Sequence, residues 1–321
     1  MNITVVGPGA LGCLLAARLH QAGGRRVRLL DHNPDRAEAL NRQGIIIEEL
    51  PSAASSAPAP SPPLSIPVST APATVTEAGA VLLCVKSFAL ESVLDAIIPH
   101  LRPATLVVAL PNGIGHLESM RRLTGHCLPA LGISTEGATL LAPGRVRAGG
   151  RGLTRLGYVE APKSNLAESD PLIQIVSLFN RAGLACTLSD DIHRDLWRKL
   201  LVNAGINALT VIHDCPNGRL LEIPEAREAM ARAVLEAAAV AAAHGVSLEE
   251  DPVAMVEEVC RNTAGNISSM LQDIRRHRPT EIMAINGEVI RRADELGLAV
   301  PENRRLVKAV DRLQAKSRPQ S

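Results

Sequence analysis

Aromatic residues are scarce in this sequence, which has only two Phe, one Tyr and one Trp among 321 residues. Proteins that bind nucleic acids commonly stack bases on aromatic side chains and carry a large positive charge, whereas the net charge here is +1. The sequence therefore predicts no nucleic-acid partner. Since 46% of the residues are hydrophobic, a core built mainly from Leu, Ile, Val and Ala is expected.

Metal sites, disulfides and membrane segments are not indicated either. The six cysteines form no Cys-x-x-Cys pair, so we expect no bound metal and no disulfide scaffold. No apolar run reaches the roughly 18 residues of a membrane span, and no signal peptide is recognisable. We therefore expect a cytoplasmic protein without a membrane partner. The oligomeric state stays open, with a homodimer as one option.

Short apolar runs alternate with helical patterns in the first part of the chain. Strands are expected at 2–6, 27–31, 45–47, 81–85 and 106–110, helices at 10–22 and 34–43, and further strands within 129–160. This alternation predicts an α/β fold, a Rossmann-type doubly wound parallel sheet, for residues 1–188. Residues 51–63 are nearly all Pro, Ala and Ser and are expected to form a surface insertion.

The rest of the chain, residues 189–321, has helical periodicity throughout. Helices are expected at 190–212, 224–244, 252–264, 266–277, 280–296 and 302–316. This pattern predicts a second, all-helical domain that carries the substrate-binding and catalytic residues.

A glycine-rich segment, Gly7-Pro8-Gly9-Ala10-Leu11-Gly12, follows the first expected strand and begins the first expected helix. In this context the pattern is typical of a dinucleotide-binding loop. Gly7 permits the tight turn, Gly9 lets the backbone approach a pyrophosphate, and Gly12 lets helix and strand pack closely. We therefore expect all six residues to contact the cofactor.

Asp31 ends the second expected strand, where a carboxylate can bind the ribose 2′-hydroxyl of NAD. His32 and Arg36 follow closely, however, and could hold the extra phosphate of NADP. A purely local role, in which Asp31 caps the turn into Pro34, is an equal alternative.

Two polar residues directly follow expected strands. Lys86 comes after 81–85, and Asn112 comes shortly after 106–110. The carboxyl edge of an open α/β sheet is where ligands bind, so both are candidate site residues. Each could also be an ordinary loop residue.

Polar residues form a stripe along the first helix of the helical domain. Lys199, Asn203 and Asn207 are spaced by four positions, and the residues around them are mostly apolar. Buried polar groups need partners, which could be neighbouring helices or a ligand. An ammonium and two carboxamides suit a carbonyl or a carboxylate.

Further along, helix caps are the simple interpretation of two polar clusters. Asn266 is the expected N-cap of a helix whose first turn contains Ser268 and Ser269, and Thr280 is a second expected N-cap, followed by Glu281. Anion binding by the serines is compatible with this role.

Several of these strings together resemble the ketopantoate reductase (2-dehydropantoate 2-reductase) family over nearly the whole chain. The resemblance rests on the segments 7–12, 84–86, 110–113, 196–200, 215–218, 266–274, 285–287 and 300–303, with Asn203, Asn207 and Glu281. It implies reduction of ketopantoate to pantoate with NADPH, a step towards coenzyme A.

The resemblance also implies roles for individual residues. Lys199 is the expected general acid, and Glu281 lies beside nicotinamide and substrate. Lys86 and Asn112 are expected on the cofactor side, with Asn112 also near the substrate. The expected substrate contacts are Asn203, Asn207, Asn217 and Ser269, the last near the carboxylate.

Simple physical chemistry agrees with this implied mechanism. Hydride attack places negative charge on the carbonyl oxygen, which a positioned ammonium stabilises and protonates. Burial must not lower the pKa of Lys199 far, and Glu281 could hold the proton on it. Asp31 stands about where the family carries a basic residue, so NAD(H) stays open beside NADP(H).

Three alternatives remain at this stage. The first is a reductase of another 2-keto acid. The second is a β-hydroxyacid dehydrogenase, which also pairs a Rossmann domain with a helical domain. The third is a nucleotide-sensing Rossmann protein without activity, although such a protein would be expected to have lost the set Lys199, Asn203 and Asn207.

Overall fold

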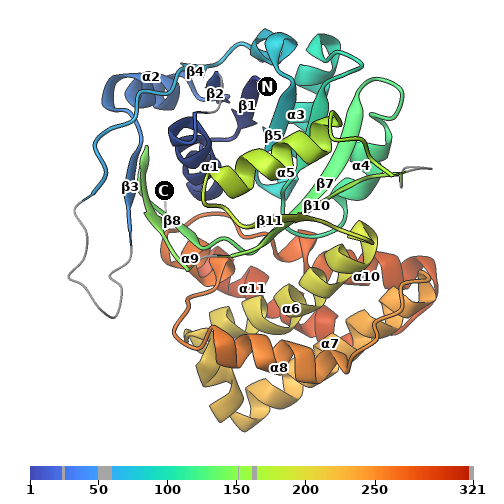
Figure 1. Ribbon diagram of the computed structural model, residues 1–321. Helices are drawn as coiled ribbons and strands as arrows, with labels where there is room; N and C mark the ends of the chain where they lie inside the picture. Colours follow the sequence, from blue (N-terminus) through green and yellow to red (C-terminus); the bar gives the residue numbers. More distant parts are fainter. Residues whose placement is uncertain (24–25, 50–59, 151, 161–164, 318–321) are drawn as a thin grey trace. The chain divides into compact units, whose positions relative to one another are not determined.

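The computed structural model describes residues 1–23, 26–49, 60–150, 152–160 and 165–317 (Figure 1). The chain forms two compact units: unit 1 contains Met1–Pro111 and His116–Ile192, and unit 2 contains Asn112–Gly115 and His193–Ser321. The expected border between residues 188 and 189 stays a prediction. The assignment of the short segment Asn112–Gly115 to the helical unit is not visible in the sequence pattern.

Unit 1 is built on an eight-stranded sheet with the order β11-β10-β7-β6-β5-β1-β2-β4. All neighbours are parallel except β7 and β10, which are antiparallel. The strands are β1 (Ile3–Val6), β2 (Val27–Leu30), β4 (Val68–Ser69), β5 (Ala80–Leu83), β6 (Leu106–Ala109), β7 (Leu128–Ser134), β10 (Thr154–Tyr158) and β11 (Cys186–Leu188). The chain order reverses between β1 and β5, and ligands of such sheets bind outside the carboxyl ends of these strands.

Helices cover both faces of this sheet. They are α1 (Ala10–Gln21), α2 (Pro34–Gln43), α3 (Leu90–Ile97), α4 (His116–Arg121) and α5 (Pro171–Arg181), with the short 3₁₀ segments η1 (Pro72–Glu77), η2 (Ser87–Ala89) and η3 (Ile98–His100). Right-handed crossovers place α1 and α5 on one face and α3 and α4 on the other. Figure 1 shows α1 and α5 together on the near face. The doubly wound fold expected for this part of the chain is confirmed.

A separate three-stranded sheet contains β3 (Ile46–Glu48), β9 (Arg145–Ala148) and β8 (Ala138–Ala142), in that order. The strand expected at 45–47 therefore exists, but it lies outside the main sheet, because the apolar pattern of a strand does not identify its partner. This small sheet covers α1, which is apolar on nearly all sides. Most of the expected insertion 51–63, namely residues 51–59, lies outside the described residues. The chain after it returns beside β3, since the Leu64 N–H donates to the Ile45 carbonyl at 2.8 Å.

Unit 2 is helical. Its helices are α6 (Ile192–His213), α7 (Pro224–Ala243), α8 (Pro252–Asn262), α9 (Ser269–Arg275), α10 (Asn286–Glu295) and α11 (Pro301–Ser317), with η4 (Asn217–Glu222) and η5 (Ile282–Ala284). The α6 helix is mostly buried, and α7 packs closely on it at Gly205, where a Cβ would lie 2.6 Å from Val234. In the described part of the chain, no helix is long and apolar enough to cross a membrane.

Two buried asparagines connect the helices of unit 2. Asn286, the first residue of α10, donates to the Ala204 carbonyl of α6 at 3.1 Å and to Asn303 Oδ1 at 3.0 Å. Asn303 in turn donates to the Ala233 carbonyl of α7 at 3.1 Å. Both asparagines are fully buried. They fix the position of α6 relative to the segment that precedes α10 and carries Glu281.

Candidate active site

The glycine loop joins β1 to α1 and lies against the end of β5. A Cβ on Gly12 would lie 2.1 Å from the Gly7 carbonyl oxygen, and one on Gly7 would lie 2.7 Å from Val85, so both positions require glycine. Gly7 also has a φ of +90°. A Cβ on Gly9, by contrast, would meet nothing within 4 Å. The first and third glycines are thus needed for packing, and the backbone at the second is open to a ligand.

The amino end of α1 has the properties of an anion site. Gly9 is the N-cap residue and supplies no side-chain hydrogen bond, and the first turn contains no acidic residue. The first backbone N–H groups of a helix are unpaired donors at the positive end of its dipole. Together with the open backbone at Gly9, they fit the pyrophosphate of a dinucleotide.

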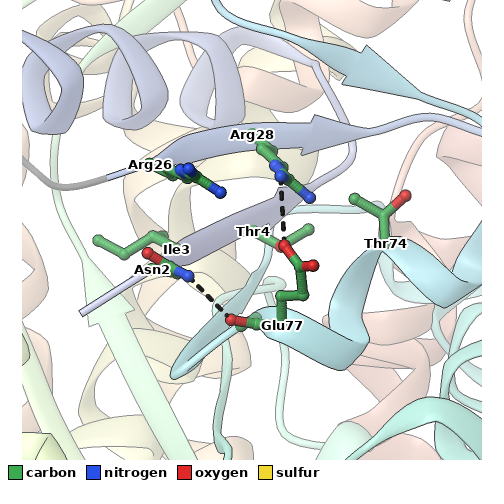
Figure 2. A pocket seen from close by; sticks show the side chains of 8 residues that line it. Asn2, Ile3, Thr4, Arg26, Arg28, Thr74 and Glu77 are labelled. Atoms are coloured by element: carbon green, nitrogen blue, oxygen red, sulfur yellow. Dashed lines mark hydrogen bonds and ion pairs between the residues drawn. The ribbon is translucent and has the colours of Figure 1, made fainter.

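A small cavity in unit 1 lies away from this loop. Figure 2 shows it near the beginning of β1, between β2 and η1, where Arg28 pairs with Glu77 at 3.3 Å. Its volume of about 10 Å³ suffices for one water molecule. The glycine loop follows the opposite end of β1, so this cavity is not part of the candidate site.

In unit 2, the polar stripe expected on α6 is present. Lys199 and Asn203 are half-buried, and Asn207 is buried. Thr210, three positions after Asn207, extends the same helical face and was missed by the sequence analysis, although its spacing could have identified it. Its hydroxyl donates to the Asn207 carbonyl at 2.8 Å and lies 2.6 Å from Ser268 Oγ.

Lys199 is the titratable group of this stripe. Desolvation lowers the pKa of its ammonium to about 8, and the charge of Glu281 acts in the opposite direction by raising it. A pKa near 8 leaves the side chain mostly protonated at neutral pH and still able to release its proton. This combination suits a general acid.

Glu281 is buried and is held by the loop that follows β6. The Asn112 amide donates to Glu281 Oε2 at 2.9 Å. The loop can approach this closely because Gly113 has a φ of +86° and a Cβ there would lie 2.1 Å from the Ala284 carbonyl oxygen. Asn112, Glu281 and Lys199 thus form one polar cluster within unit 2, which we call the lysine cluster.

Comparison with known proteins identifies the family of this chain. A family model described as ketopantoate reductase PanE/ApbA matches residues 3–161, and the model of the C-terminal part of that family matches residues 191–314. The 2-dehydropantoate 2-reductase of Halobacterium salinarum is 33% identical over 311 residues, which are 97% of this chain and 98% of the relative. That of Vibrio cholerae is 33% identical over 98% of both chains.

The chain belongs to the ketopantoate reductase family.

Solved structures are similar over the full length. A ketopantoate reductase of the PanE/ApbA family from Ralstonia eutropha JMP134 matches with a TM-score of 0.85 and 30% identity, over 99% of both chains. A D-mandelate dehydrogenase with NADH and anilino(oxo)acetate matches with a TM-score of 0.86 and 26% identity, also over 99% of both chains. As a ketopantoate reductase family member, this protein is an oxidoreductase that uses a pyridine nucleotide, and the glycine loop of unit 1 fits such a cofactor.

The end of β2 differs from the simple NAD pattern. Asp31 is buried and is paired with Arg36 of α2, whose Nε donates to Oδ2 and whose Nη2 donates to Oδ1, both at 2.5 Å. The Asn33 N–H also donates to Oδ1, at 3.1 Å. Asp31 therefore anchors Arg36 and the turn into α2. This arrangement agrees with the local structural role that the sequence left as one alternative.

The structure also gives positions for three other expected site residues of this ketopantoate reductase family member, Lys86, Ser269 and Asn217. Lys86 is half-buried directly before η2 in unit 1. Ser269 is exposed as the first residue of α9. Asn217 is buried as the first residue of η4. Their roles towards cofactor and substrate stay predictions.

The expected caps of two helices were wrong. Ser268, not Asn266, is the N-cap of α9, and its hydroxyl accepts from the Leu271 N–H at 3.1 Å. The Asn266 carbonyl instead accepts from the Asn217 N–H at 3.0 Å, a contact with a distant segment that the local sequence cannot reveal. Thr280 starts no α-helix, because the short η5 intervenes before α10 begins at Asn286.

Proposed function

We propose that this protein reduces ketopantoate to pantoate with NADPH, in the synthesis of pantothenate and coenzyme A. The observation that carries the proposal is the lysine cluster, in which Asn112 holds the buried Glu281 carboxylate whose charge raises the pKa of Lys199. The relatives named 2-dehydropantoate 2-reductase, similar over nearly the full length, support the substrate.

When bound in the proposed reaction, a reduced nicotinamide would supply the hydride that the keto carbon gains. Lys199 donates its proton to the keto oxygen, which gains the negative charge, and the ammonium stabilises that oxygen before the proton moves. Glu281 raises the pKa of Lys199 and so keeps the acid charged at neutral pH. Asn203, Asn207 and Ser269 are the proposed contacts for the rest of the substrate, and Lys86 is a proposed cofactor contact.

The charges exposed at the end of β2 support the proposed preference for NADPH over NADH. The Asp31 side chain is 0% exposed under Arg36, whereas the Arg36 and His32 side chains are 34% and 84% exposed. A ribose 2′-hydroxyl cannot reach the carboxylate without displacing Arg36, but a 2′-phosphate can meet the guanidinium. Arg36 thus takes the role of the basic residue that the end of β2 lacks.

A second candidate is a reductase of another 2-keto acid that uses NADH. The D-mandelate dehydrogenase with NADH and anilino(oxo)acetate, which matches with a TM-score of 0.86, favours this candidate. The reaction of this second candidate would differ from ketopantoate reduction in the side chain of the substrate, whereas the reduction of the keto group would be the same. The cytoplasmic location and a homodimer both stay predictions.

One assay separates these candidates. The purified protein is mixed with NADPH or NADH and with ketopantoate or benzoylformate, the keto acid that corresponds to mandelate, and oxidation of the reduced cofactor is followed by absorbance. The proposal expects the highest kcat/KM for NADPH with ketopantoate. Faster turnover of benzoylformate with NADH would establish the second candidate, and inactivity with ketopantoate and both cofactors would exclude the proposed reaction.

A further inference from the structure

Asn217 lies where two distant segments of unit 2 are joined by backbone hydrogen bonds. Its N–H donates to the Asn266 carbonyl at 3.0 Å, and the next N–H, of Gly218, donates to the Ala264 carbonyl at 3.1 Å. A Cβ on Gly218 would lie 2.6 Å from the Ala264 Cβ, so the approach depends on this glycine. These bonds fix the backbone of Asn217. They do not fix which end of its side-chain carboxamide faces which neighbour.

That orientation is determined by Thr263, the C-cap residue that follows α8. The Thr263 hydroxyl donates to the Val259 carbonyl at 2.7 Å, which uses its single proton. The same hydroxyl oxygen lies 2.9 Å from Asn217 Nδ2 and can only accept there. The two ends of a carboxamide have the same shape, but only the amide end can face an oxygen that has no proton to offer.

The carbonyl end of the Asn217 carboxamide is consequently directed away from Thr263. Asn217 is 8% exposed, and within the described part of the chain its buried Oδ1 accepts no hydrogen bond. Unpaired buried acceptors are rare because they cost free energy. A buried Oδ1 that is held in this orientation therefore indicates a ligand that donates a hydrogen bond to it.

Asn217 is also connected to the helix that carries Lys199. The Asn266 carbonyl that accepts from Asn217 is two residues before Ser268, and Ser268 Oγ lies 2.6 Å from Thr210 Oγ1 on α6. Thr210 belongs to the polar face that contains Lys199. Hydrogen bonds therefore link the segment of Asn217 to the helix that carries Lys199.

We propose that Thr263 is a positioning residue that presents the Asn217 carbonyl oxygen to a hydroxyl group of the substrate. This inference rests on the proposed reduction of a 2-keto acid. The carboxylate and keto groups of such an acid only accept hydrogen bonds, so a hydroxyl is the substrate group that can donate to Oδ1. The site then selects a hydroxylated 2-keto acid, such as ketopantoate, over the same acid without its hydroxyl.

The test compares ketopantoate with trimethylpyruvate, which is ketopantoate without its hydroxyl. The ratio of their kcat/KM values is measured for the wild type and for Thr263→Val, which keeps the shape of the side chain and the backbone N–H bond to Val259. Thr263→Ser restores the hydroxyl, and Thr187→Val makes the same chemical change at an exposed position in β11 of unit 1.

We expect the wild type, Thr263→Ser and Thr187→Val to prefer ketopantoate by roughly 10- to 100-fold, because an unmet buried acceptor penalises the analogue. Thr263→Val should lose most of this preference through a rise in KM for ketopantoate. A general folding defect would lower both kcat/KM values and leave their ratio unchanged.

Two results would overturn the inference while leaving the proposed function intact: a wild-type ratio near one, which needs no variant to measure, or an unchanged ratio in Thr263→Val. If the wild type reduces trimethylpyruvate but not ketopantoate with either cofactor, the proposed function itself is wrong, and the inference with it.

Discussion

The Asn112 amide donates a 2.9 Å hydrogen bond to Glu281 Oε2, although the two residues are 169 positions apart in the chain. Gly113 makes this contact possible by its close approach to the Ala284 carbonyl. The bond holds the Glu281 carboxylate whose charge raises the pKa of Lys199 against the effect of desolvation. The loop after β6 therefore contributes to the protonation state of a lysine on α6.

Substitution of Lys199 tests the general acid directly. Lys199→Ala should lower kcat for ketopantoate by roughly 10²- to 10⁴-fold, the usual contribution of a positioned acid. Cofactor affinity should change little, because the glycine loop lies in unit 1. Both quantities are measured by steady-state kinetics and by titration of NADPH fluorescence. Lys308→Ala, at an exposed position of α11, is the control. Turnover near the wild-type rate would exclude Lys199 as the acid.

The pH dependence of reduction should follow the protonation of Lys199. Only the ammonium can donate a proton, so kcat/KM for reduction should fall as the pH rises through about 8, the pKa of Lys199 in the ligand-free protein. The reverse reaction, oxidation of pantoate, needs the neutral amine and should rise over the same range. Profiles of kcat/KM against pH, measured for reduction and for oxidation, check the direction of both changes.

Glu281→Gln refines this test. The glutamine keeps an oxygen that can accept from Asn112 but removes the charge that raises the pKa of Lys199. The fall in the reduction rate should therefore move to lower pH. An unchanged midpoint in this variant would show that Glu281 does not set the pKa of the acid.

Local signals in the sequence predicted some elements closely and others poorly. The expected helix 34–43 is confirmed as α2, because its ends are encoded nearby: the Asn33 side chain caps the Arg36 N–H at 2.8 Å, and Gly44 has a φ of +70°. The helix expected from residue 266 begins only at Ser269, because the backbone at Asn266 pairs with the distant Asn217.

In the candidate site too, features that depend on neighbouring residues could be predicted, whereas contacts between separate segments could not. The spacing of Lys199, Asn203 and Asn207 follows from helix geometry and could be predicted. The sequence could not show that Arg36 occupies both oxygens of Asp31, since acid and base at this spacing can also stay apart in solvent. Nor could it show that Thr263 determines the orientation of Asn217, because this contact joins two separate turns.

Cofactor choice should depend on Arg36. Arg36→Gln removes the exposed guanidinium and uncovers the Asp31 carboxylate, which would then repel a 2′-phosphate. We expect the ratio of kcat/KM for NADPH to that for NADH to fall roughly 10- to 100-fold, as expected for the loss of a charged hydrogen bond. Arg42→Gln on the same helix, with a side chain that is 69% exposed, should leave the ratio unchanged. A wild-type preference for NADH that survives Arg36→Gln would contradict the assignment.

The glycines of the loop should separate cofactor binding from folding. Gly12→Ala places a Cβ 2.1 Å from the Gly7 carbonyl oxygen, so the backbone must shift, at a cost of about 1–3 kcal/mol in the free energy of unfolding. Gly9→Ala meets nothing within 4 Å, so the stability of the cofactor-free protein should change by less than about 1 kcal/mol. Its methyl group nevertheless occupies the open face against which a pyrophosphate would lie, so we expect the Kd for NADPH to rise at least about tenfold. Urea unfolding and NADPH titration measure the two effects. If Gly9→Ala binds NADPH as tightly as the wild type, the dinucleotide does not approach the backbone at this residue.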